Sequence, residues 1–248
     1  SLSKQIHALE TELGVPLFTR GEVALTPAGE ALLARALRIL ADVDTARREV
    51  HDLVGLGRGR VRLGATPSLC TALAPRVLRA FHDSHPGIEL YVSEGGSHDL
   101  VRDLGRGELD LALIVLPAQG TEPGLHAEPI LREPLVVASG TPIEGPLRIA
   151  DLKDRPMVMF RDGYNLRDDA LDAFRRAGIT PTYAVEGGEL DAVLGFVEAG
   201  LGVALVPEMV LANRPRLHAA RLAGAGIHRT IAVARRRGVG LTHAARAL

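Results

Sequence analysis

Apolar residues along this chain recur with a helical period in some stretches and form short continuous runs in others. The first helical pattern runs from Leu2 to Leu13, and polar residues occupy the other side of that helix. Gly14 predicts the end of the helix, and apolar residues at 23 and 25 predict a small hairpin. Thr26 followed by Pro27 predicts the cap of a second helix.

The second helical pattern predicts one long helix over residues 27–54, because this stretch is rich in Ala, Leu and Arg and has no internal Pro. Apolar residues at alternating three- and four-residue steps form a seam along it: Leu33, Ala36, Leu40, Val43, Val50 and Val54. Either two copies pair along this seam as a coiled coil, or the helix packs on its own domain, and the periodicity alone favours neither. A glycine-rich run at 55–59 predicts a hinge.

Beyond residue 60, strand and helix patterns alternate, which predicts an α/β fold of two subdomains. The first set comprises strands at 61–65, 88–93, 109–115 and 135–138 and helices at 68–82 and 99–106. The second set comprises strands at 157–160, 183–186 and 202–206 and helices at 167–177 and 190–199. Pro75 must start, bend or restart its helix. A strand at 231–234 returns to the first subdomain, and a final helix starts at residue 242.

Composition sets limits on function. The 248 residues are 46% hydrophobic, which is ample for one large or two modest cores. The formal net charge of −1 gives no global attraction to nucleic acid, so any DNA-binding role must rest on a motif. The lone Cys70 cannot close a disulfide within the chain. No apolar run approaches the roughly 20 residues of a membrane-spanning helix, and no signal segment opens the chain, so we expect a cytoplasmic protein without membrane contact.

Small hydroxyls, an amide and a cation near the start of a helix suit contact with a DNA duplex. The run LSKQIHALETELGVPLFTR, followed by LTPAGEALL, resembles the recognition helix and wing of LysR-type transcriptional regulators. The resemblance implies a winged helix-turn-helix over residues 1–26, of which the earlier helices are missing, so we expect an N-terminally truncated chain. The DNA contacts that it implies are Ser1, Ser3, Lys4, Gln5, His7 and Arg20.

The same resemblance favours a dimerisation helix at 27–56. It also implies that residues 60–248 form an effector domain of the type II periplasmic-binding-protein fold, built from two Rossmann-like subdomains. We expect lobe I at about 60–154 with 229–248 and lobe II at about 155–228.

In open α/β sheets, ligands bind beyond the carboxyl ends of strands, where helix N-termini favour an anion. Strand-to-helix turns at 66–68, 97–99 and 207–208 fit this rule, and the resemblance adds weight to 66–68, 97 and 207. The expected effector contacts are Thr66, Pro67, Ser68, Ser97, Arg161, Tyr164, Asn165, Gly187, Gly188, Val206 and Pro207. The alternative is that the hydroxyls and Asn165 only cap helices and that Arg161 makes a surface ion pair.

Catalytic and metal sites find little support. Ser97, His98 and Asp99 are adjacent and cannot line up as a triad, and His82 and His85 lack a third metal ligand. We therefore expect no enzyme activity, metal or cofactor. The sequence predicts a ligand-responsive transcription factor whose partners are double-stranded operator DNA, a small anionic effector, further copies in a homodimer or tetramer, and RNA polymerase. The alternative is a monomeric solute-binding module of the same fold.

Overall fold

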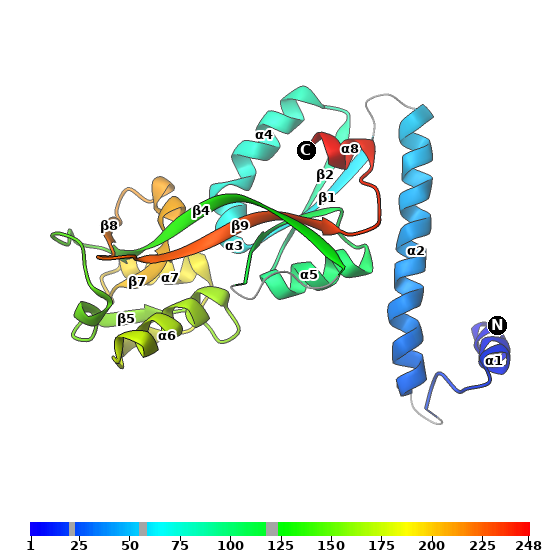
Figure 1. Cartoon of the computed structure of the whole chain (residues 1–248), viewed down its shortest axis with the longest axis horizontal. Helices are drawn as coiled ribbons and strands as arrows, with labels where there is room; N and C mark the ends of the chain where they lie inside the picture. The colour runs from blue at the N-terminus through cyan, green and yellow to red at the C-terminus, as the bar shows by residue number, and fades with distance from the viewer. Residues whose placement is uncertain (20–22, 55–58, 118–123) are drawn as a thin grey trace.

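A computed structural model describes residues 1–19, 23–54, 59–117 and 124–248, without the side chains of residues 48, 49 and 51–54. The expected DNA contact Arg20, the seam position Val54 and most of the expected hinge at 55–59 lie outside what is described. Figure 1 shows the helices α1 (Leu2–Leu13) and α2 (Pro27–Val54) at one end of the molecule and a two-lobed α/β body beside them.

The region before α2 is held by a few backbone contacts. Helix α1 ends at Gly14, whose φ of 71° is the left-handed conformation that glycine adopts most easily. At the expected hairpin, an antiparallel bridge joins Phe18 to Leu25, the Thr19 amide donates to the Ala24 carbonyl and the Thr26 amide donates to the Leu17 carbonyl, while the turn at 20–22 lies outside the described residues. Thr26 Oγ1 accepts a hydrogen bond of 3.1 Å from the Gly29 amide, which confirms the predicted cap of α2.

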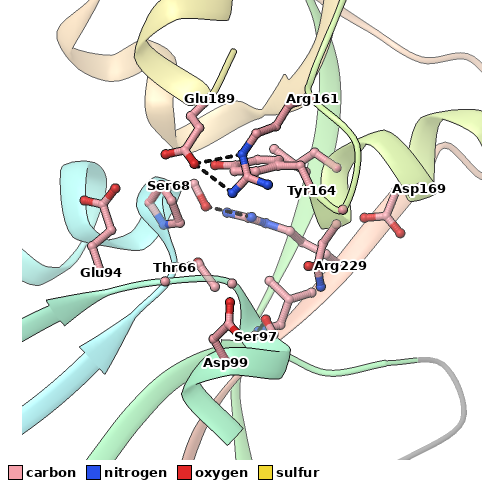
Figure 2. A pocket seen from close by; sticks show the side chains of 17 residues that line it. Thr66, Ser68, Glu94, Ser97, Asp99, Arg161, Tyr164, Asp169, Glu189 and Arg229 are labelled. Atoms are coloured by element: carbon pink, nitrogen blue, oxygen red, sulfur yellow. Dashed lines mark hydrogen bonds and ion pairs between the residues drawn. The ribbon is translucent and has the colours of Figure 1, made fainter. Parts of the chain in front are cut away.

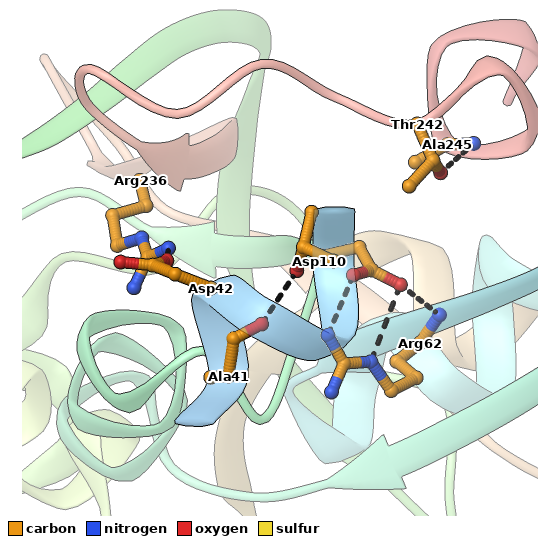
Figure 3. Close-up of polar contacts among 8 residues, drawn as sticks. Ala41, Asp42, Arg62, Asp110, Arg236, Thr242 and Ala245 are labelled. Carbon is orange, nitrogen blue, oxygen red and sulfur yellow. Dashed lines mark hydrogen bonds and ion pairs between the residues drawn. The ribbon is translucent and has the colours of Figure 1, made fainter. Parts of the chain in front are cut away.

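Helix α2 is continuous and packs on the body with one side only. It contacts α5, α8 and β1, and Ala41 lies so close to Gly107 that a Cβ at position 107 would stand 2.4 Å from the Ala41 Cβ. Asp42 forms an ion pair with Arg236 beside this contact (Figure 3). Four seam residues are exposed, Leu33, Leu40, Val43 and Val50, and Ala36 is half-buried. The helix therefore packs on its own domain and still leaves the predicted seam uncovered.

Lobe I is built on three parallel strands, of which two, β1 and β3, are largely buried, as apolar strands inside a parallel sheet are, whereas the edge strand β2 is largely exposed. The strands are β1 (Gly59–Ala65), β2 (Ile88–Glu94) and β3 (Leu111–Val115), in the order β2-β1-β3. The helices around them are α3 (Pro67–Ala72), α4 (Ala74–Ser84), α5 (Ser97–Arg106) and α8 (His243–Ala247). The predicted break at Pro75 is confirmed, since α3 ends and α4 begins there. Residues of α3, α4 and α8 form one core, and α5 covers a second.

Lobe II combines the rest of the large sheet with a small one. Strands β7 (Ala204–Pro207) and β8 (His218–Arg221) pair with β4 (Leu125–Ser139), and β5 (Pro156–Met159) pairs with β6 (Thr182–Glu186). The helical segments are α6 (Asn165–Ala177), α7 (Leu190–Glu198), η1 (Ile149–Leu152) and η2 (Glu208–Asn213). Two buried clusters fill this lobe, one beneath α7 and one beneath α6.

Two long strands cross between the lobes, as Figure 1 shows in green and orange-red. Strand β9 (Ile227–Arg236) pairs with β4 from Leu125↔Arg236 to Leu135↔Ile227, with a bulge between Pro129 and Leu131. Residues 135–139 then pair with β7 and β8. Lobe II therefore begins within β4 rather than near residue 154 as expected, because the apolar run 135–138 belongs to the second lobe's part of the sheet.

Candidate functional site

A cavity of about 290 Å³ lies between the two lobes (Figure 2). Its volume is near the lower end of the range for small-molecule sites and equals that of about ten liquid water molecules. The lining residues come from the ends of β1, β2 and β3, the starts of α3, α5 and α6, and the start of β9. They include seven expected contacts: Thr66, Pro67, Ser68, Ser97, Arg161, Tyr164 and Asn165.

Two helices of ten or more residues begin at this cavity. Helix α5 starts after Gly96 and helix α6 after Tyr164, and neither preceding residue makes a side-chain cap bond to its helix. The first amides of both helices therefore remain without intrahelical partners, and the positive ends of both helix dipoles point toward the same space. This arrangement favours an anionic group in the cavity.

The three expected hydroxyls have different environments. Ser68 Oγ accepts a hydrogen bond of 2.8 Å from Arg229 Nη1, and Ser97 Oγ accepts one of 3.2 Å from the Val115 amide. Thr66 is more than nine-tenths buried, and its Oγ1 has no hydrogen-bond partner among the described residues. Thr66 precedes α3 without capping it, so the capping alternative does not account for this hydroxyl. The Thr66 hydroxyl is left available to a ligand.

A buried ion pair forms the base of the cavity. Arg229 on β9 and Glu133 on β4 are direct cross-strand partners, and the Arg229 Nε donates to Glu133 Oε2 at 2.8 Å. Arg229 Nη2 lies 2.7 Å from the same oxygen but outside hydrogen-bonding direction, so within the described chain its hydrogens are unused. The other carboxylate oxygen, Glu133 Oε1, accepts from the Met209 amide at 2.9 Å. Sequence reasoning missed this pair, because 96 residues separate its members and no motif marks them.

The rim of the cavity on lobe II carries an aromatic side chain and a second ion pair. Arg161 Nη2 lies 2.7 Å from Glu189 Oε1, and both side chains are about half exposed. The Arg161 guanidinium stands 5.8 Å from the centre of the Tyr164 ring, which stacks on Phe160. Burial, followed by the nearby Glu189 and Glu94 carboxylates, raises the pKa of Tyr164. Arg161 therefore combines the two roles expected of it, an ion pair and a place at the cavity.

Four expected contacts do not line this cavity. Gly187 and Gly188 follow β6 and are hydrogen-bonded to the chain at the end of β5: the Gly187 amide donates to the Met159 carbonyl, and the Gly188 carbonyl accepts from the Arg161 amide. Val206 and Pro207 are buried and pair with β4. The turn after Pro207 starts the 3-10 helix η2, and the Met209 amide in its first turn donates a hydrogen bond to Glu133. An internal carboxylate thus occupies the place at which we expected a ligand.

Cys70 lies on α3 close to the cavity and is only partly exposed. Its Sγ lies 3.5 Å from the Ala65 carbonyl oxygen, to which the thiol can donate. Burial, with a further contribution from Glu94, raises the pKa of Cys70 to about 11. The group therefore stays a protonated, weakly nucleophilic thiol at neutral pH.

Helix α1 presents its expected DNA contacts openly. Ser1, Ser3, Lys4, Gln5 and His7 are all exposed, and Figure 1 shows α1 standing apart from both lobes. No residue of α1 is buried within the described chain. Such a helix is free to approach another macromolecule.

Two other kinds of feature are absent from the described residues. No cluster of three or more His, Cys, Asp or Glu side chains has the geometry to hold a metal ion there. Among the described helices, none combines the length and the apolarity needed to span a bilayer.

The fold and the cavity define a two-lobed ligand-binding domain attached to a long helix and a short exposed one. Comparison with protein families identifies both parts. The model for the LysR substrate binding domain matches residues 55–248, and the model for bacterial regulatory helix-turn-helix proteins of the lysR family matches residues 1–30. The chain belongs to the LysR family of transcriptional regulators, so it is a DNA-binding regulator and not an enzyme. The match at residues 1–30 argues against a solute-binding module without DNA-binding duty.

Individual relatives agree with this assignment. The chain is 31% identical over 221 residues to the transcriptional dual regulator GltC of Bacillus subtilis, covering 86% of this chain and 73% of GltC. It is 35% identical over 253 aligned residues to a probable hydrogen peroxide-inducible genes activator of Streptomyces viridosporus, covering 96% of this chain and 79% of the relative.

Solved structures show the same fold along nearly the whole chain. A full-length OxyR variant from Pseudomonas aeruginosa superposes with a TM-score of 0.74 at 27% identity, covering 99% of this chain and 82% of that one. Full-length CbnR in complex with its target DNA superposes with a TM-score of 0.69 at 26% identity, covering 99% of this chain and 86% of that one. The expected type II periplasmic-binding-protein-like fold is confirmed.

Proposed function

We propose that the cavity between the lobes is the effector site of this regulator and that it takes a small molecule with an anionic group. The observation that carries the proposal is the buried Thr66 hydroxyl, which lines the cavity without a partner among the described residues. A buried polar group of this kind costs free energy unless a ligand or water satisfies it. The uncapped starts of α5 and α6 supply the positive potential for the anion.

Replacing Thr66 with valine is the sharpest test of the site. The free energy of unfolding without ligand should stay the same or rise by up to about 1 kcal/mol, because the substitution removes a buried hydroxyl that has no partner. Ligand affinity should fall about tenfold, the usual cost of a lost hydrogen bond to a charged group. Differential scanning fluorimetry against a panel of small organic acids finds the ligand, and calorimetry measures its dissociation constant.

The matched control is Thr242→Val, which removes a buried hydroxyl that does have a partner. Thr242 Oγ1 accepts a hydrogen bond of 3.2 Å from the Ala245 amide at the start of α8 (Figure 3). This variant should lose about 1 kcal/mol of stability and keep full ligand affinity. If no organic acid stabilises the protein, or if Thr66→Val binds its acid as tightly as the parent, the proposed site is wrong.

We further propose that the exposed polar residues of α1 contact operator DNA, as the match to the helix-turn-helix family suggests. Lys4→Ala should weaken binding and reduce the slope of log affinity against log salt by about 1, because one phosphate contact is lost. The other lysine of the chain, Lys153, lies on lobe II, so Lys153→Ala should leave both quantities unchanged. Fluorescence anisotropy at several salt concentrations, on a duplex selected from a random pool, measures both. An unchanged salt slope for Lys4→Ala would remove Lys4 from the contacts.

The uncovered seam on α2 supports pairing of subunits in a homodimer or tetramer. Exposed apolar side chains at helical spacing, among them Leu40 at 63% and Val50 at 62% exposure, gain from burial against a second copy. A two-fold protein can engage two half-sites on one face of a duplex. Ligand binding would shift the equilibrium between arrangements of the two lobes. That shift would change the angle between the DNA-binding regions of the paired subunits, and with it their contact with RNA polymerase. Because operator DNA is the partner in this proposal, we expect the protein to act in the cytoplasm.

A response to peroxide is not part of the proposal, although two relatives, from Streptomyces viridosporus and Mycobacterium avium, carry that description. The chain has a single cysteine, and the raised pKa of Cys70 keeps its thiol protonated at neutral pH. Oxidation by peroxide requires the thiolate. The cavity, not the thiol, is therefore the sensing element that we propose.

A further inference from the structure

The charges around the cavity do not match those of a simple anion site. The lining residues include four carboxylates, Glu94, Asp99, Asp169 and Glu189, and only two guanidinium groups, Arg161 and Arg229. Both guanidinium groups already have carboxylate partners, Glu189 for Arg161 and Glu133 for Arg229. An anion alone would therefore enter a cavity with excess negative charge, which is unfavourable unless the ligand also carries positive charge.

Two of the four carboxylates have no partner. Asp99 pairs with Arg102 at 2.8 Å, and Glu189 pairs with Arg161. For Glu94 and Asp169, no hydrogen bond or ion pair is found anywhere in the described chain. Glu94 ends β2 in lobe I, whereas Asp169 lies on α6 in lobe II. The two unpaired carboxylates thus reach the cavity from opposite lobes.

The surroundings of Glu94 and Asp169 indicate that each carboxylate lacks a positively charged partner. Figure 2 places Glu94 and Asp169 toward opposite sides of the cavity, with Thr66 and Arg229 between them. Asp169 is partly buried on α6, and burial raises the pKa of its carboxyl group despite the opposing effect of Arg229. Glu94 is exposed at the end of β2 and lines the cavity, and its carboxylate adds to the effect of burial in raising the pKa values of Tyr164 and Cys70. A cation in the cavity would stabilise the ionised form of Asp169 and offset the negative charge of Glu94.

The cavity nevertheless keeps its features for an anion, namely the uncapped starts of α5 and α6 and the buried, unpartnered Thr66 hydroxyl. We propose that the effector is zwitterionic: its anionic group binds at these helix starts and Thr66, and an ammonium group pairs with Glu94, Asp169 or both. This inference rests on the proposed effector site. An ammonium has three donors and no acceptor, which suits two acceptor carboxylates. An amino acid or a related aminocarboxylate of about ten non-hydrogen atoms fits the volume of about 290 Å³.

Ligand pairs that differ only in the amino group test the inference. Suitable pairs are 4-aminobutyrate with butyrate, 5-aminovalerate with valerate, glutamate with glutarate, and phenylglycine with phenylacetate. Calorimetry on the full chain should show at least one amino compound that binds about tenfold or more tightly than its desamino partner. Desamino acids that bind as tightly as their amino partners would overturn the inference and leave the effector site standing. A complete absence of binding by both classes would contradict the site as well.

Variants locate the ammonium group. In Glu94→Gln combined with Asp169→Asn, the preference for the amino compound should fall below about threefold, whereas affinity for the desamino acid should stay the same or rise. The matched control is Asp168→Asn, which removes the same charge from the next position of α6, where the side chain is exposed and does not line the cavity. This control should keep the full preference. A preference that survives the double substitution, or that falls equally in the control, would refute the proposed pairing.

Discussion

Replacing Glu133 with alanine is expected to lower the free energy of unfolding by about 3–5 kcal/mol, because Arg229 would remain buried without its counter-charge. The two side chains are only 4% and 3% exposed, so water cannot take the place of the lost carboxylate. The Met209 amide would lose its acceptor in the same variant. Denaturation in urea, followed by circular dichroism, measures the change.

Two further variants separate burial from charge. Glu89→Ala breaks an ion pair of 2.8 Å with Arg60 whose side chains are 70% and 59% exposed, and it should cost at most about 1 kcal/mol. Glu133→Leu combined with Arg229→Met should recover most of the lost stability, since an apolar pair of similar volume replaces both charges. A loss in Glu133→Ala no larger than that in Glu89→Ala would show that the pair is hydrated in solution.

Phe160→Ala is expected to cost about 3–5 kcal/mol, the usual loss when a fully buried aromatic side chain is truncated. Phe160 is 1% exposed and stacks on Tyr164 with ring centres 4.9 Å apart, so the cavity wall should loosen as well. The control is Tyr91→Ala on β2, where the ring is 59% exposed and the cost should stay within about 0.5 kcal/mol. Thermal unfolding measures the loss of stability in both variants, and equal losses would contradict the assignment of Phe160 to the core.

Much of the fold could be predicted because its signals are local. The strand Leu111–Val115 is recognisable from an apolar run after a glycine turn, since both faces of a parallel sheet are covered. The restart of a helix at Pro75 follows from the missing amide of proline. The boundary between the lobes could not be located in this way. The run 135–138 has the composition of a buried strand, and nothing local shows which neighbours it pairs with.

Some residues of the site could likewise be predicted from local sequence patterns, and others could not. Thr66, Ser97 and Tyr164 lie at strand-to-helix turns, which the sequence pattern reveals, and all three line the cavity. Arg229 and Glu133 meet only because two strands distant in sequence cross between the lobes. Glu94 and Asp169 look like ordinary surface acids in the sequence, and their significance depends on having no partner in the fold. Long-range pairing and missing partners are properties of the three-dimensional structure alone.

Strand β9 carries both Arg229, at the base of the cavity, and Arg236, which pairs with Asp42 of the linker helix. The two residues are seven positions apart along the extended strand, a span of about 23 Å at about 3.3 Å per residue. Because β9 stays paired with β4 over this length, a torsion applied at one end is transmitted without any slack loop between. Closure of the lobes on a ligand would therefore change the angle between the two-lobed domain and α2. The DNA-binding region at the other end of α2 would move with that helix.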